Sequence, residues 1–143
     1  MTEVHLAVGV GVLGLNLAAG LLGGVCWLRR EPSVPFWYLL RTAQAAVFAQ
    51  AMIGIILIFL GHRADDLHYL YGVLPLLVSL LAETIRAGAA GQELVGLDFE
   101  GLPKDRQRRI ALAIVRREMG VMAVSCLVIF FLALRAAGTS SAF

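Results

Sequence analysis

Residues 4–28 read VHLAVGVGVLGLNLAAGLLGGVCWL, and no charged side chain lies between Glu3 and Arg29. A hydrocarbon core about 30 Å thick is crossed by a helix of about 20 mostly apolar residues. This stretch therefore predicts a transmembrane helix, and it decides the fold class. Further apolar stretches follow at 36–61, 67–87 and 119–134, and the last is preceded by an amphipathic stretch at 109–118, so the predicted helices are 4–28, 36–61, 67–87 and 104–136.

The overall composition agrees with this interpretation. Hydrophobic residues make up 59% of the 143 residues and charged residues 15%, whereas soluble domains have about 45–50% and about 25%. A soluble globular domain and a disordered chain are both excluded, because disorder requires low hydrophobicity and high net charge. The formal net charge of +2 provides no basic field for nucleic acid.

Short connections between the first three stretches make neighbouring helices antiparallel. The sequence therefore predicts an all-α polytopic membrane protein, a single domain over 1–143 folded as an up-down-up-down four-helix bundle. We expect the fourth helix to begin near Lys104 and to enter the membrane near Arg116 or Arg117. The loop over 88–105 is expected to be a solvated connector, with partner docking as the alternative.

The distribution of positive charge predicts the orientation, because cytoplasmic loops collect Lys and Arg. With both termini outside, only Arg63 and Arg135 of the 12 Lys and Arg residues lie on the outer side. We therefore expect a protein integral to the cytoplasmic (cell) membrane, with the 88–105 loop inside. Cys26 and Cys126 then lie at different depths, which argues against a disulfide.

The two helices that run inwards carry the same pattern, His-x-x-x-Gly, near their outer ends. His5 precedes Gly9 on the first helix, and His68 precedes Gly72 on the third. Residues four apart share a helix face, so each glycine lies one turn deeper than its histidine. Neutral imidazoles from opposite sides ligate haem iron, and a glycine leaves room for the porphyrin edge. The pattern predicts haem b with His5 and His68 as axial metal ligands and Arg63 near the propionates.

A second interpretation of the same residues stays open. His5 and His68 also fit interfacial side chains that reach towards water. The glycines then serve only the close approach of helices. His62 is expected to be a loop residue.

The arrangement resembles one half of a haem A synthase, and more widely the four-helix membrane b-type cytochromes. The resemblance rests on His5 with Gly9 and on His68 within LHYLYG at 67–72, and it covers topology over about 4–135. It implies axial histidines at helix ends near the outer face. The eight-helix fold and the Glu-x-x-His-Arg type motif of haem A synthase are absent from this sequence, so catalysis is not implied and no catalytic residue is predicted. No second histidine pair exists at the inner side to build a two-haem path.

A second polar group is expected near the inner ends of the second and third helices. Arg41 and Gln44 share one face of their helix, at a depth similar to that of Glu83. An Arg41–Glu83 ion pair would neutralise both charges and fix the register of the helices. The alternative is that Glu83 carries protons in transport. Gln50 lies on the opposite face from Arg41 and is expected to bond across helices.

Two functions from different classes follow from these patterns. The first is a small haem-binding membrane protein that serves electron transfer or haem handling, with one b-type haem near the outer face. The second is a non-catalytic membrane subunit or assembly factor of a larger complex. The expected partners are the lipid bilayer and either a membrane protein or a second copy of the chain, and nucleic acid is not among them.

Overall fold

The computed structural model describes residues 2–139, apart from the side chains of residues 89, 90 and 93. All of its regular structure within this range is helical, and each of the four helices is long and apolar enough to cross a membrane. The helices are α1 (Thr2–Arg29), α2 (Val34–Phe59), α3 (Asp66–Leu94) and α4 (Lys104–Gly138). This confirms the predicted all-α membrane class.

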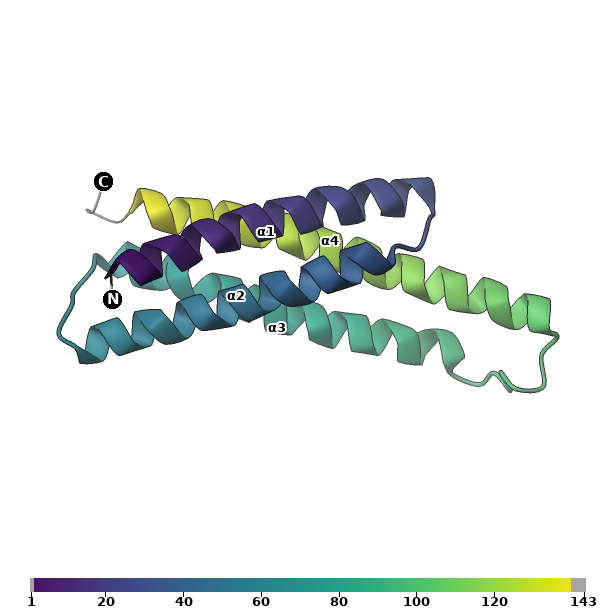
Figure 1. Ribbon diagram of the computed structural model, residues 1–143. Coiled ribbons are helices and arrows are strands. Elements are labelled where there is room, and N and C mark those ends of the chain that lie inside the picture. Colours follow the sequence, from purple (N-terminus) through teal and green to yellow (C-terminus); the bar gives the residue numbers. More distant parts are fainter. Residues whose placement is uncertain (1, 140–143) are drawn as a thin grey trace.

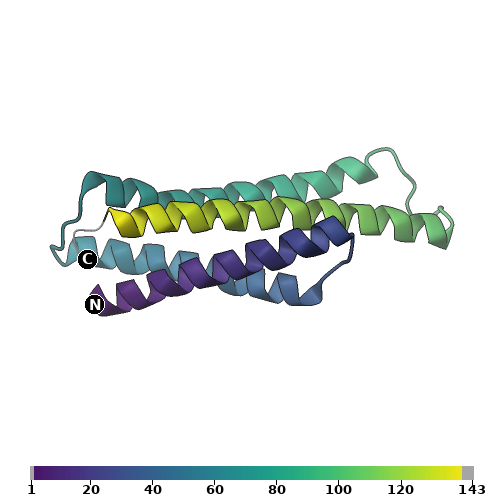
Figure 2. The same ribbon diagram turned by 90° about the horizontal axis from the view of Figure 1, so that it is seen from above.

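The helices pack as an antiparallel four-helix bundle (Figure 1). The helix α4 packs extensively against both α1 and α3, and α1 packs against α2, whereas the α2–α3 seam is much sparser. Figure 2 shows the same arrangement from above, with the start of α1 and the end of α4 at one end. Consequently α1 and α3, the two helices that carry the His-x-x-x-Gly patterns, are diagonal partners across the bundle. Which end faces the cytoplasm stays a prediction from the positive charges.

The turns are as short as the sequence suggests. Ser33 precedes α2, and its side-chain oxygen accepts a hydrogen bond of 3.3 Å from the Phe36 N–H, which satisfies one of the free donors at the helix start. Gly61 follows α2 with a φ of 85°, a conformation that glycine adopts without steric cost. Both connections hold their helices antiparallel.

The connection between α3 and α4 differs from the expected loop over 88–105. The helix α3 continues to Leu94, so the connection covers only 95–103. Gly88 and Gly91 suggested a loop, but the residues around them are good helix formers and the segment continues the helix. The end of α3 and the start of α4 project beyond the α1–α2 turn (Figure 1). A helix of 35 residues at about 1.5 Å per residue is longer than the hydrocarbon core, so α4 extends well outside it.

Close approach between α1 and its neighbours depends on glycine. A Cβ at Gly23 would lie 2.9 Å from the Ala123 Cβ and in collision with the Phe36 ring, and one at Gly20 would lie 2.7 Å from the Leu127 Cγ. Gly20, Gly23 and Asn16 are buried on the face of α1 that packs against the bundle. The core beside them contains large side chains from α2 and α4 together with several alanines. Its buried members are Ala19, Phe36, Leu40, Ala82, Met119, Met122, Ala123 and Cys126.

We expect Gly23→Ala to lower the free energy of unfolding by about 1–3 kcal/mol, because the added methyl overpacks this core. Gly24→Ala is the matched control, since nothing lies within 4 Å of a Cβ at that neighbouring glycine. The control should be neutral or stabilising by up to about 1 kcal/mol through helix propensity. Both values can be measured by detergent-induced unfolding followed by circular dichroism. Equal effects of the two variants would contradict the assigned helix interface.

Candidate functional site

The two histidines of the His-x-x-x-Gly patterns meet inside one end of the bundle. His5 in the first turns of α1 and His68 in the first turns of α3 have ring centroids 6.1 Å apart, with an angle of 57° between the ring planes. Both side chains are half-buried. Because α1 and α3 are diagonal, the imidazoles approach each other across the bundle interior.

His68 is oriented by a backbone carbonyl of α4. Its Nδ1 lies 3.0 Å from the Ala136 carbonyl oxygen. A carbonyl only accepts hydrogen bonds, so Nδ1 carries the proton and donates it. The neutral ring therefore keeps its lone pair on Nε2, which is the state of a metal-ligating histidine whose other nitrogen is held by an outer partner.

His5 is held by an amide from α2. The Gln50 Nε2 lies 3.2 Å from the His5 Nε2. The remaining polar atoms of this pair, His5 Nδ1 and Gln50 Oε1, are buried and have no hydrogen-bond partner. Buried polar groups are nearly always hydrogen-bonded. The His5–Gln50 pair therefore lacks a hydrogen-bond acceptor or donor at two of its buried atoms. The sequence indicated that Gln50 bonds across helices, but not that its partner is His5.

The glycines near the two imidazoles differ in their surroundings. A Cβ at Gly9 would lie 3.1 Å from the Gln50 Nε2, so the space that Gly9 leaves is taken by this amide. Gly54 on α2 faces His5, and a Cβ there would lie 3.5 Å from the imidazole Cε1. Gly72 is exposed and faces open space.

The predicted propionate partner, Arg63, lies in the α2–α3 turn. It lines a surface hollow of about 440 Å³ together with His62, Asp66 and Tyr69. The Tyr69 hydroxyl accepts a hydrogen bond of 2.9 Å from the Ala64 N–H and so braces this turn. The hollow contains both signs of charge, because it is lined by the Arg63 guanidinium and by the Asp66 carboxylate.

The number of side chains near the two histidines that could ligate a metal distinguishes between a bare metal ion and haem iron. Among the residues that the structure describes, no group of three or more His, Cys, Asp or Glu is placed to hold a metal ion. A bare transition-metal site usually needs three or four protein ligands. Haem iron needs only axial ligands from the protein, because the porphyrin supplies the other nitrogens. Two imidazoles therefore fit haem better than a bare ion.

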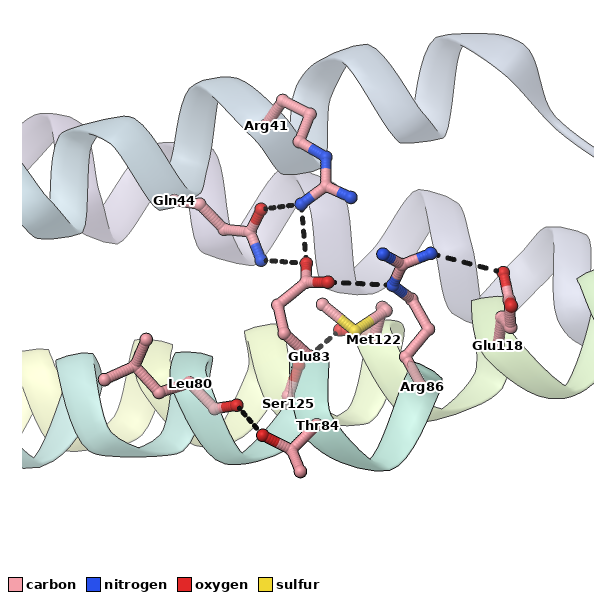
Figure 3. Close-up of polar contacts among 9 residues, drawn as sticks. All are labelled: Arg41, Gln44, Leu80, Glu83, Thr84, Arg86, Glu118, Met122 and Ser125. Carbon is pink, nitrogen blue, oxygen red and sulfur yellow. Dashed lines mark hydrogen bonds and ion pairs between the residues drawn. The ribbon is translucent and has the colours of Figure 1, made fainter. Parts of the chain in front are cut away.

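The predicted Arg41–Glu83 ion pair is present near the other end of the bundle, as part of a larger network (Figure 3). The Arg41 Nη1 donates to Glu83 Oε1 at 2.5 Å and to Gln44 Oε1 at 2.6 Å. The Gln44 amide also donates to Glu83 Oε1, at 2.7 Å. The other carboxylate oxygen, Oε2, accepts from the Arg86 Nε at 2.8 Å.

Arg86 extends the network to α4. Its Nη1 lies 3.5 Å from the Glu118 Oε2, and its guanidinium carbon lies 5.9 Å from the Trp37 ring centroid. With two guanidinium groups and two carboxylates, the four charged members sum to zero. A set of ionisable groups that pair with one another and sum to zero charge is the form in which such groups are tolerated at membrane depth. The network therefore links α2, α3 and α4 and fixes their register, which favours the structural interpretation of the Arg41–Glu83 pair.

The helices and their packing define the class of this protein, an all-α membrane protein built as a four-helix bundle. No protein-family model, curated protein or solved structure matches the chain.

Proposed function

We propose that this chain is a small haem-binding membrane protein, with one haem b held near the outer face between His5 and His68. The observation that carries the proposal is the meeting of these two imidazoles from diagonal helices. The excess of Lys and Arg at the opposite end supports insertion into the cell membrane with the haem site on the outer side.

The distance between the rings supports the proposal. Two imidazole–metal bonds of about 2 Å each, with a ring radius of about 1 Å at both ends, place ring centroids about 6 Å apart. The observed separation is 6.1 Å. His68 has its Nδ1 anchored to a carbonyl, which leaves Nε2 as donor. On His5, the Nε2 lies 3.2 Å from the Gln50 amide and the buried Nδ1 has no hydrogen-bond partner.

When bound, haem b would supply a one-electron carrier. The chain's own contribution would be to hold the two imidazoles opposite each other at one end of the bundle, with Arg63 at the adjacent turn as a partner for a carboxylate group. The proposed activity is therefore electron transfer or haem handling.

The test is an absorption spectrum of protein purified in detergent and titrated with haem. We expect one haem per chain, with a Soret band and a sharp α-band on reduction. Because His5 and His68 would both ligate the iron, we expect the reduced protein not to bind carbon monoxide. A protein that stays colourless with excess haem would contradict the proposal and favour the non-catalytic membrane subunit instead.

A further inference from the structure

The Gln50 side chain reaches from α2 into the histidine site on α1. Its Nε2 lies 3.2 Å from the His5 Nε2 and would lie 3.1 Å from a Cβ at Gly9. Gly9 is one helical turn from His5 on the same face of α1. The amide therefore occupies both the lone-pair side of this imidazole and the space next to it.

The contact between the amide and the imidazole satisfies neither group. An amide nitrogen only donates, so the His5 Nε2 accepts and Nδ1 carries the proton, in a buried position without an acceptor. The Gln50 Oε1 is also buried without a donor. Turning the amide by 180° would let the ring donate to the oxygen, but the amide nitrogen would then take the buried, unpartnered position. In both orientations this closed arrangement leaves polar atoms unpaired, which destabilises it.

We propose that Gln50 is a displaceable cap on His5, which competes with an iron-containing ligand for the imidazole nitrogen. This inference rests on the proposed function. Withdrawal of the amide frees the His5 Nε2 and the space above Gly9 in one movement. Gly54, one turn along α2 from Gln50, places no side chain against His5, so the ring has room to turn as the cap leaves.

The cap predicts that Gln50→Ala binds haem about tenfold more tightly than the unchanged protein, with faster uptake, because the ligand no longer displaces an amide. The measurement is a haem titration in detergent, read at the Soret band. Met52→Ala is the matched control: it removes a side chain of similar size from the same helix, at a position that is 42% exposed. The control should leave the affinity unchanged.

A second measurement uses the haem-free protein with ¹⁵N-labelled histidine. Gln50→Ala should shift the nitrogen resonances of His5 and leave those of the loop residue His62 in place. Binding of haem by the unchanged protein, combined with equal or weaker binding by Gln50→Ala, would overturn the cap and spare the proposed function. Unchanged His5 resonances would overturn it as well. Failure of the unchanged protein to bind haem would instead overturn the proposed function.

Discussion

Replacing His68 with alanine is expected to convert a six-coordinate, low-spin haem into a five-coordinate form that binds carbon monoxide when reduced. The reason is the loss of one of two axial nitrogens, together with the anchor that fixes it to the Ala136 carbonyl. Removing only an outer partner of a metal ligand commonly costs 10–100-fold in affinity, so the loss of the ligand itself should cost about a hundredfold or more. Haem titration and the spectrum of the reduced protein measure both effects.

His5→Ala should give the same change in coordination, because the two rings occupy equivalent positions on either side of the site. The matched control is His62→Ala, since this third histidine lies exposed in the α2–α3 turn. It should retain the six-coordinate spectrum. Free imidazole added to the His68→Ala protein should restore the low-spin bands by filling the vacated position. A normal spectrum in either ligand variant would place the haem elsewhere.

The sequence predicted the architecture well because each membrane helix is encoded locally. A run such as 4–28 must be helical in lipid, where each backbone polar group has to be hydrogen-bonded within the segment. The depth of each residue then follows from helix geometry, and this placed His5 level with His68 and Arg41 level with Glu83. In the structure, Arg41 and Glu83 form an ion pair, and the rings of His5 and His68 face each other with their centroids 6.1 Å apart.

Features that depend on packing were not predicted from local patterns. The length of the α3–α4 connection was overestimated, because Gly88 and Gly91 were interpreted as loop residues whereas α3 continues to Leu94. The contact between Gln50 and His5 depends on the rotation of α2 against α1, which periodicity alone does not fix. A search for polar residues level with each histidine on every helix would have revealed it.

The extension of the Arg41–Glu83 network to α4 also depends on helix packing rather than on a local sequence pattern. Glu118 lies in a basic, amphipathic segment, and only the packing of α4 against α3 brings it to Arg86. The sequence supported a single ion pair between two helices. The structure has a chain of charges across three helices, so the loss of its central carboxylate should affect this whole end of the bundle.

Glu83→Ala is expected to destabilise the protein by about 2–3 kcal/mol. The carboxylate accepts hydrogen bonds from Arg41, Gln44 and Arg86, and hydrogen bonds to charged groups contribute about 1.5–3 kcal/mol each. The expected loss is below their sum because the Arg41 side chain is 52% exposed and retains its hydrogen bond to Gln44. Detergent-induced unfolding measures the change, and Glu31→Ala in the exposed α1–α2 turn is the control.

A double-mutant cycle separates the ion pair from general damage to the helix. Arg41→Ala alone removes one partner of Glu83, and the double variant removes the pair together. If the two side chains stabilise the bundle through each other, the double variant loses less stability than the sum of the single variants, by at least about 1 kcal/mol. Strict additivity would show that the two residues act independently. In that case the pair would not fix the register of α2 against α3, and the sparse α2–α3 seam would have to be held by α1 and α4 alone.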